Sequence, residues 1–181
     1  MFKSNFEKGC MLVLGGAKSG KSSFALKICN DLNRKHVFLA TAQAFDQEMK
    51  DRIRCHQAER GGRWTTVEEP LDLVARIREL DTDDTVILID CLTLWLNNLF
   101  MKYETDHDAV YQAIEELADL LPDMRGAVVM VSNEVGAGIV PENPLSRRFR
   151  DTAGIVNQRM ALLARKVVVT FAGLPMVLKD E

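Results

Sequence analysis

Short apolar segments alternate along the chain with longer segments of helical period. Five apolar runs, each of four to six residues, lie at Cys10–Leu14, Val37–Ala40, Val86–Ile89, Ala127–Val131 and Val167–Ala172. They are rich in Val, Ile and Leu with little polar alternation, which is typical of strands covered on both faces of a parallel sheet. The predicted helices are Ser22–Asn33, Asp46–Arg60, Leu71–Leu80, His107–Leu121 and Leu145–Ala164. Strand–helix alternation predicts an α/β fold, and the tail Pro175–Leu178 is predicted to add an edge strand.

Composition narrows the class of protein. The chain has 181 residues, of which 47% are apolar and 27% charged, and its net charge is −3. These values indicate one soluble globular domain, and they argue against disorder and general nucleic-acid binding. No apolar run reaches the ~18 residues that span a membrane. We therefore predict one domain over residues 1–181, in which residues 1–10 form a short lead.

Cysteine usage indicates a reducing compartment. Cys10, Cys29, Cys55 and Cys91 are far apart, and no zinc-type spacing of Cys and His is present. The short apolar run that follows the polar N-terminus stops at Gly15, too soon for the core of a signal peptide. We expect reduced, mostly buried thiols and a cytoplasmic location.

A phosphate-binding loop follows the first predicted strand. The segment Gly15-Gly-Ala-Lys-Ser-Gly-Lys-Ser22 fits G-x-x-x-x-G-K-[ST]. Its glycines allow backbone N–H groups to surround phosphate oxygens, and the helix that follows directs its positive end at the same anion. Lys21 is expected to reach the β- and γ-phosphates and Ser22 to ligate Mg²⁺. The alternative is a glycine-rich turn that binds nothing, and the strand before the motif and the helix after it argue against that alternative.

Asp90 ends the most apolar run, Val86–Ile89. A carboxylate there is predicted to lie beside the loop and to hold Mg²⁺ directly or through water. An ordinary helix N-cap is the alternative. Motor ATPases and small kinases share this pair of features, so the pair alone names no reaction.

His56 lies on the predicted helix Asp46–Arg60, with Arg52 one turn before it and Arg60 one turn after it. An imidazole flanked by guanidinium groups suits attack on a phosphate. From residue types alone, however, a histidine packed at the edge of the core is the simpler interpretation.

The pattern as a whole resembles the bifunctional adenosylcobinamide kinase / adenosylcobinamide-phosphate guanylyltransferase family of cobalamin biosynthesis. The resemblance runs from about Met11 to Lys179 and includes the phosphate loop and Glu48-Met-x-x-Arg-Ile-x-x-His56. It also includes Trp64-Thr-Thr-Val-Glu-Glu-Pro70, Asp90-Cys-Leu-Thr-Leu-Trp-Leu-x-Asn98 and Ser132-Asn-Glu-Val-Gly-x-Gly-Ile-Val-Pro-Glu-Asn-Pro144. Several such stretches in the family's order shift the interpretation of His56 towards a nucleophile. The fold implied is a P-loop NTPase (RecA-like) domain with a mostly parallel central sheet flanked by helices.

The resemblance implies two reactions at one nucleotide site. A nucleoside triphosphate phosphorylates the aminopropanol hydroxyl of adenosylcobinamide, with Lys21 and Mg²⁺ stabilising charge. The histidine that matches His56 then attacks the α-phosphate of GTP, and the guanylyl-histidine passes GMP to adenosylcobinamide phosphate, giving adenosylcobinamide-GDP. The co-substrates implied are GTP and ATP, and the implied assembly is a homotrimer.

Residues carried over by position form one proposed nucleotide site. His56 and Lys21 are the catalytic residues implied, and Ser22 and Asp90 the metal ligands. The nucleotide contacts implied are Gly15, Gly16, Ala17, Lys18, Ser19, Gly20, Lys21, Ser22, Ala40, Thr41, Ala42, Gln57, Ala58, Glu59, Arg60, Glu68 and Asp90. Asn133 and Glu134 open a Pro-punctuated loop after the fifth apolar run, and we expect them to contact substrate.

Two other functions remain open at this point. One is a P-loop kinase of another small alcohol in which His56 is structural. The other is a nucleotide-dependent RecA-like ATPase or switch that acts on a macromolecule. The net charge of −3 and the lack of a basic stripe argue against a motor that acts on DNA or RNA, and no membrane partner is expected.

Overall fold

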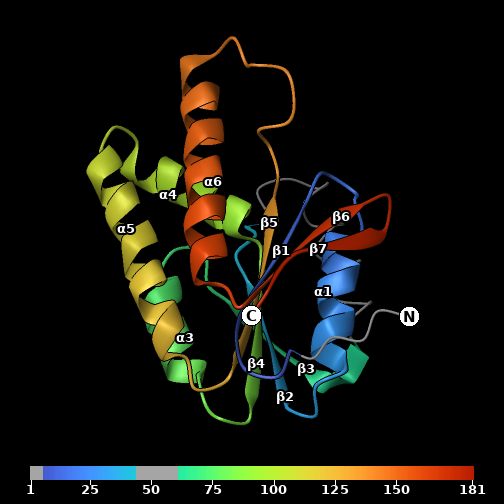
Figure 1. Ribbon diagram of the computed structural model, residues 1–181. Helices are drawn as coiled ribbons and strands as arrows, with labels where there is room; N and C mark the ends of the chain where they lie inside the picture. Colours follow the sequence, from blue (N-terminus) through green and yellow to red (C-terminus); the bar gives the residue numbers. More distant parts are fainter. Residues whose placement is uncertain (1–5, 44–60) are drawn as a thin grey trace.

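The computed structural model describes residues 6–43 and 61–181 and contains a seven-stranded sheet (Figure 1). The strand order is β3-β2-β4-β5-β1-β6-β7, and all neighbours are parallel except β6 and β7. The strands are β1 (Gly9–Gly15), β2 (Lys35–Ala40), β3 (Trp64–Glu68), β4 (Thr85–Asp90), β5 (Ala127–Asn133), β6 (Lys166–Phe171) and β7 (Leu174–Asp180).

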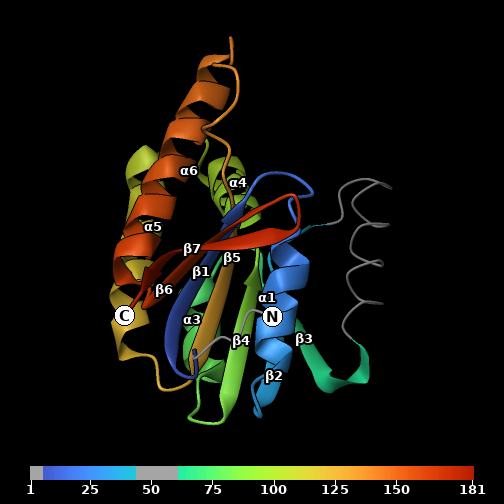
Figure 2. The same cartoon turned by 45° about the vertical axis from the view of Figure 1, so that its right-hand side comes forward.

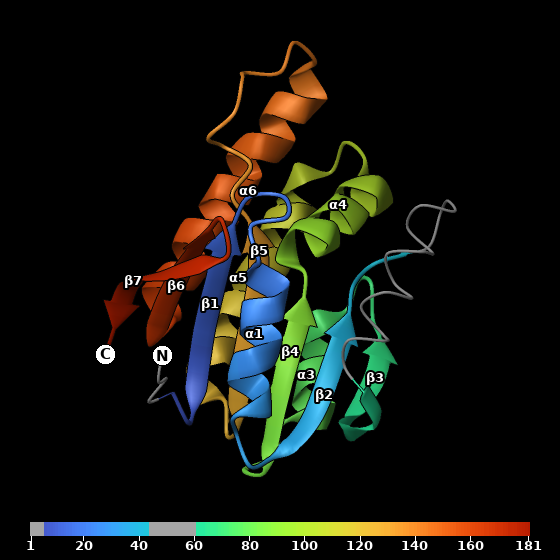
Figure 3. The same ribbon diagram turned by 90° about the vertical axis from the view of Figure 1, so that its right-hand side faces the viewer.

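Helices cover both faces of the sheet. Helix α1 (Lys21–Asn30) lies on one face, as Figure 3 shows. Helices α3 (Leu73–Leu80), α4 (Leu92–Tyr103), α5 (His107–Leu120) and α6 (Pro144–Leu163) lie on the other. Two short 3₁₀ turns, Gly61–Arg63 and Leu121–Asp123, complete the described elements. None of the described helices is long and apolar enough to span a bilayer.

The hydrophobic core divides into two layers, one on each side of the sheet. Successive side chains of a strand point to opposite faces. In β5, Val128 and Met130 therefore pack with α3–α6, whereas Val129 and Val131 pack against α1. The central strands are apolar on both faces, which confirms the pattern predicted for a covered parallel sheet.

The predicted strands and helices that fall within the described residues are all present, with ends shifted by up to three residues. The helix predicted from Leu71 begins at Leu73, because the Asp72 side chain caps it by accepting a hydrogen bond from the Ala75 N–H at 3.1 Å. The predicted tail strand is present as the antiparallel edge strand β7. The predicted helix Asp46–Arg60 lies wholly outside the described residues.

The carboxyl ends of the parallel strands gather at one edge of the sheet, where α/β folds bind ligands. The segments that follow β1, β4 and β5 all begin at this edge. Helix α6 extends beyond it (Figures 1 and 2), and the segment that joins β5 to α6 rises alongside the helix. This edge holds the candidate site.

Candidate nucleotide-binding site

The predicted phosphate loop connects β1 to α1. Lys18 and Gly20 adopt positive φ angles of 54° and 94°, so the backbone turns sharply before the helix begins at Lys21. Inside the loop, the Ser19 N–H donates to the Gly16 carbonyl at 3.3 Å. The segment therefore has the tight, glycine-dependent turn that the motif predicts.

The N-terminus of α1 has no side-chain cap. Gly20 occupies the N-cap position and supplies no side-chain acceptor for the first-turn N–H groups. Those groups and the positive end of the helix dipole thus face the loop, and an anion is their natural partner.

The end of β6 and the turn between β6 and β7 contact the phosphate loop through Ser19. The Ser19 hydroxyl lies 2.8 Å from the hydroxyl of Thr170 on β6, and the Gly173 N–H donates to the Ser19 carbonyl at 2.9 Å. A Cβ atom on Gly20 would stand 3.0 Å from the Gly173 Cα. These contacts fix the loop from residues about 150 positions away, and the local motif did not predict them.

Lys21 lies within the loop and its ammonium group is half-buried. Its Nζ donates to the Gly16 carbonyl at 3.0 Å. Burial lowers the pKa of Lys21, while nearby Cys91 and Asp90 oppose this shift. Asp90 thus lies close enough to Lys21 to act on it electrostatically.

Cys91 is a buried thiol beside this pair. Burial, reinforced by the charge of Asp90, raises the pKa of Cys91 to about 12. The side chain stays protonated at neutral pH and caps α4 by accepting from the Leu94 N–H at 3.4 Å. Cys91 is therefore a structural group here, because a reactive thiol requires a lowered pKa.

Strand alternation places one row of residues on the α1 face at the carboxyl edge. Asp90 follows Val86 and Leu88 of that face, and Asn133 follows Val129 and Val131. Gly15 pairs in register with both Asn133 and Thr170. Asn133 thus stands on the strand between the phosphate loop and Asp90.

Thr41 ties the segment after β2 to the start of α4. Its hydroxyl accepts from the Cys91 N–H at 2.7 Å and donates to the Cys91 carbonyl at 2.9 Å. The buried Asn98 amide donates to the carbonyls of Thr41 at 2.8 Å and Pro70 at 3.0 Å. Ala40 and Thr41 are thereby held beside Asp90, with which Ala40 pairs in register, and Ala42 follows.

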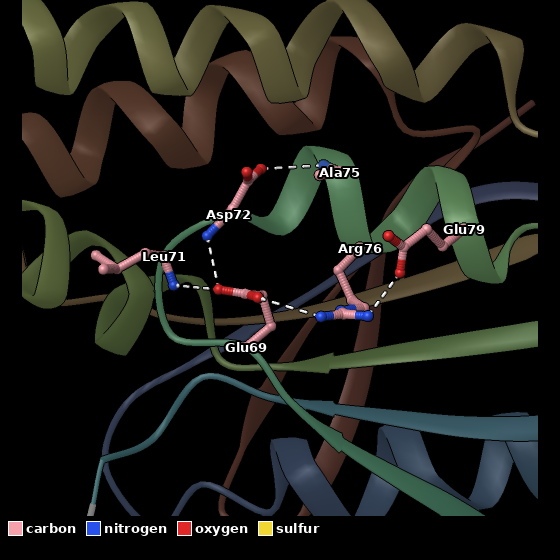
Figure 4. A network of polar contacts seen from close by, with 6 residues as sticks. All are labelled: Glu69, Leu71, Asp72, Ala75, Arg76 and Glu79. Carbon is pink, nitrogen blue, oxygen red and sulfur yellow. Dashed lines mark hydrogen bonds and ion pairs between the residues drawn. The ribbon is translucent and has the colours of Figure 1, made fainter.

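Glu68 ends the outermost strand and is exposed on the same side as Ala40, its register partner. The turn that follows it is fixed by Glu69, shown in Figure 4. Glu69 accepts from the Leu71 and Asp72 N–H groups at 3.0 and 2.8 Å, and Arg76 lies 3.9 Å from its second oxygen. The turn leaves the Glu68 carboxylate at the edge of the site, and no hydrogen bond within the described residues is recorded for it.

A second polar network lies behind the end of β5. The Ser132 hydroxyl donates to Asn157 Oδ1 at 2.6 Å and lies 3.3 Å from the Thr93 hydroxyl. Thr93 Oγ1 accepts from the Asn133 N–H at 2.8 Å, and Asn157 Nδ2 donates to the Asn133 carbonyl at 3.1 Å. Residues from α4 and α6 therefore clamp both backbone groups of Asn133. Within an apolar strand or helix, a lone polar residue such as Ser132 is the only sequence signal of this network.

A cavity of about 820 Å³ opens between α4, the start of α6 and the segment after β5. Phe100 and Phe149 meet edge to face within it, with ring centroids 5.6 Å apart. His107 and Arg148 contact each other at its rim. The cavity can take an apolar, ring-containing group, because aromatic walls with a few polar groups are typical of small-molecule sites.

The donor set at the loop fits Mg²⁺. Magnesium is commonly held by one or two protein oxygens, with substrate phosphates and water completing its shell. Ser22 and Asp90 offer a hydroxyl and a carboxylate of this kind. Across residues 6–43 and 61–181, no three His, Cys, Asp or Glu side chains form a cluster suited to a metal.

The loop residues Gly15–Ser22, together with Ala40–Ala42, Glu68 and Asp90, all lie along this one edge. His56, Gln57, Ala58, Glu59 and Arg60 lie outside the described residues. Sequence reasoning assigned no role to Thr93, Asn157 or Thr170, although Thr93 lies within the quoted stretch Asp90–Asn98; their contacts position the site.

Comparison with known proteins gives concordant matches. The family described as cobinamide kinase / cobinamide phosphate guanyltransferase matches residues 11–178. The bifunctional adenosylcobalamin biosynthesis protein CobP of Pseudomonas aeruginosa is 44% identical over 170 residues, covering 94% of this chain and 97% of that protein. The bifunctional adenosylcobalamin biosynthesis protein CobU of Escherichia coli is 38% identical over 180 residues, covering 93% and 99%.

Solved structures with little sequence similarity share the fold. An ATPase from the type III secretion system of pathogenic bacteria superposes with a TM-score of 0.55 at 11% identity, covering 89% of this chain and 50% of that chain. The RadB recombinase superposes with a TM-score of 0.52 at 13% identity, covering 91% and 75%. These likenesses confirm the predicted RecA-like P-loop fold and say nothing further of function.

Proposed function

The chain belongs to the cobinamide kinase / cobinamide phosphate guanyltransferase family, and from this premise we propose how its single site performs both reactions. The enzyme is a transferase with both activities, in adenosylcobalamin biosynthesis. The proposed substrates are adenosylcobinamide and then adenosylcobinamide phosphate, with ATP or GTP as phosphoryl donor and GTP as guanylyl donor. The observation that carries the proposal is the phosphate loop beside Asp90, in a chain whose family match spans residues 11–178.

In the kinase step, the phosphate loop binds the nucleoside triphosphate. The uncapped N–H groups of α1 and the loop amides hold the phosphate oxygens. Lys21 exchanges its contact with the Gly16 carbonyl for an ion pair with the β- and γ-phosphates. The phosphate charges then stabilise the ammonium group, whose hydration burial has reduced. Mg²⁺, held by Ser22 and Asp90, supplies further charge neutralisation when bound.

In the guanylyl step, His56 attacks the α-phosphorus of GTP. The bond from His56 to phosphorus forms, the bond from that phosphorus to the α–β bridging oxygen breaks, and pyrophosphate leaves. The phosphate oxygen of adenosylcobinamide phosphate then displaces His56, giving adenosylcobinamide-GDP. This covalent route divides one displacement into two, and Gln57–Arg60 and Glu68 are the proposed contacts to the rest of GTP.

The cavity beside α4 is the proposed binding site for the corrinoid substrate. Its volume of about 820 Å³ falls in the range of small-molecule sites. Helix α4 starts next to Asp90, and Phe100 follows Leu92 by two turns, so the aromatic wall lies about 12 Å from the start of the helix. An apolar ring bearing polar arms fits a wall of Phe100 and Phe149 with Arg148 at the rim.

A homo-oligomer, a trimer by family resemblance, is part of the same proposal. Exposed apolar side chains gather on the β6–β7 hairpin, where Leu174 is 72% and Phe171 64% exposed. Clusters of this kind mark interaction surfaces. We expect Leu174→Lys combined with Phe171→Lys to reduce the mass measured by light scattering, and an unchanged mass would argue against this face. A cytoplasmic location is also proposed, because Cys10, Cys29 and Cys91 are free, buried thiols.

A two-stage assay tests the proposed activities. Purified enzyme is given Mg²⁺, adenosylcobinamide and ATP, and the corrinoid product is identified by mass spectrometry; GTP is then added. We expect adenosylcobinamide phosphate in the first stage and adenosylcobinamide-GDP in the second. Phosphorylation of other small alcohols at a comparable kcat/KM, or nucleotide hydrolysis stimulated by DNA or RNA, would favour one of the alternative functions instead.

A further inference from the structure

Asn133 carries a buried oxygen that lacks a partner. Its side-chain Oδ1 is shielded from solvent, and no hydrogen-bond donor reaches it among the residues that the structure describes. Buried polar atoms nearly always form a hydrogen bond, because a buried donor or acceptor without one lowers the stability of the fold by about 1–3 kcal/mol. Elsewhere in the described chain, only Arg76 Nε shares this condition, and Arg76 lies on helix α3, where its guanidinium group faces Glu69 and Glu79 (Figure 4).

The backbone of Asn133 is held rigidly. Thr93 from α4 accepts its N–H, Asn157 from α6 donates to its carbonyl, and the neighbouring Glu134 N–H donates to the Gly15 carbonyl at 3.1 Å. Thr93 and Asn157 are themselves buried. Such support is expected for a side chain whose position matters, since a functional group must be held close to its working geometry.

The position of Asn133 faces the phosphate site. Strand alternation puts it on the α1 face with Asp90, and β5 lies between β4, which carries Asp90, and β1, which leads into the loop. An acceptor oxygen on the strand between the phosphate loop and Asp90, the proposed metal ligand, suits a group that orients the attacking hydroxyl.

We propose that Asn133 Oδ1 accepts a hydrogen bond from the attacking hydroxyl of the alcohol substrate in the kinase step. This inference rests on the proposed function, and Asn133 then acts as a catalytic residue that orients the nucleophile. An amide oxygen only accepts, so it aligns the O–H group and a lone pair of the oxygen towards phosphorus. The hydroxyl oxygen forms the new bond to γ-phosphorus, the bond to the β–γ bridging oxygen breaks, the nucleoside diphosphate leaves, and the proton passes to solvent. The amide stays neutral throughout.

The guanylyl step separates this role from a structural one. Attack of His56 on GTP uses the same nucleotide site but involves no alcohol. Loss of the Asn133 oxygen should therefore slow phosphoryl transfer and leave the labelling of the enzyme by GTP unchanged. A residue that merely shapes the loop would affect both steps alike.

The test compares Asn133→Ala and Asn133→Asp with Asn33→Ala. Asn33 is exposed in the connection between α1 and β2, at the opposite edge of the sheet, and serves as the matched control. The readouts are kcat and KM for adenosylcobinamide phosphorylation, nucleotide Kd, and the rate of enzyme labelling from GTP labelled on the α-phosphate. Thermal denaturation checks that each variant folds. If Asn133→Ala fails to fold, Asn133→Asp, which retains an acceptor oxygen, takes its place in the comparison.

We expect Asn133→Ala to lower the phosphorylation kcat by about 10–100-fold, in the range of a lost transition-state hydrogen bond. Its nucleotide Kd and labelling rate should stay within twofold of the wild type, Asn133→Asp should retain more kinase activity than Asn133→Ala, and Asn33→Ala should match the wild type. Equal losses in both steps, or no loss in either, would overturn the assignment. If the wild type phosphorylates no corrinoid, the proposed function fails instead; if the wild type is not labelled, nucleotide Kd alone provides the comparison.

Discussion

Replacing Gly15 with alanine tests how closely the phosphate loop packs against β6. A Cβ atom on Gly15 would stand 2.3 Å from Ser19 Oγ, 2.6 Å from Thr170 Oγ1 and 2.9 Å from the Thr170 carbonyl oxygen. Contacts this short force a shift, and the Thr170 carbonyl belongs to β6, which is hydrogen-bonded to β1 on one side and β7 on the other. The Ser19 hydroxyl would have to leave its bond to Thr170.

The expected cost follows from these contacts. Overpacking of a well-packed site costs about 1–3 kcal/mol, and the lost hydroxyl–hydroxyl bond adds about 1 kcal/mol. Reduced entropy of the unfolded chain returns about 0.4–1 kcal/mol. The net loss in unfolding free energy is about 2 kcal/mol, which lowers Tm by roughly 4–8 °C for a chain of this size.

Urea unfolding and binding of a fluorescent GTP analogue measure the two consequences of Gly15→Ala. Displacement of Ser19 also shifts the loop amides, so we expect nucleotide Kd to rise at least about tenfold, the equivalent of 1.4 kcal/mol. Gly16→Ala is the matched control for stability, because a Cβ there meets no atom within 4 Å. If Gly15→Ala is as stable as Gly16→Ala and binds the analogue as the wild type does, the reasoning on loop packing is refuted.

Three further predictions concern stability, pH and the large substrate. Asn98→Ala removes the donor to the carbonyls of Thr41 and Pro70, and urea unfolding should show a loss of about 2–4 kcal/mol, against almost none for the exposed Asn97→Ala. Burial raises the pKa of Cys10 and Cys91 from 9.0 to about 12, so the folded state holds these protons more tightly. Their contribution to the unfolding free energy is therefore fully present below pH 9 and is lost as the pH rises towards 12. Unfolding free energies that are equal at pH 8 and pH 10.5 would contradict this. Phe149→Ala should raise KM for adenosylcobinamide several-fold and leave nucleotide Kd unchanged. An unaltered corrinoid KM in steady-state kinetics would exclude the cavity as the corrinoid-binding site.

The sequence predicts the central architecture well, because buried strands and amphipathic helices leave strong periodic patterns. Strand β3 escaped prediction for the opposite reason. As the outermost strand it exposes Thr65, Thr66 and Glu68, so it lacks the apolar run that identified its neighbours. Edge strands of this kind are placed by pairing with the sheet, here with β2, and pairing is not encoded locally.

The candidate site divides in the same way. Gly15–Ser22 and Asp90 were predicted because a loop that binds phosphate constrains residue types within a short segment. The contacts of Ser19 with Thr170, and of Asn133 with Thr93 and Asn157, join residues far apart in the chain. Only the folded sheet brings them together, so no motif could reveal them.

The covalent step is the central claim, and a pulse–chase experiment tests it most directly. Enzyme is incubated with Mg²⁺ and GTP labelled on the α-phosphate, freed of nucleotide, and then given adenosylcobinamide phosphate. We predict label on His56 that is labile in acid and stable in alkali, its quantitative transfer to adenosylcobinamide-GDP in the chase, and no label on His56→Ala. Unlabelled wild type, full labelling of His56→Ala, or label that the chase does not move would contradict the account.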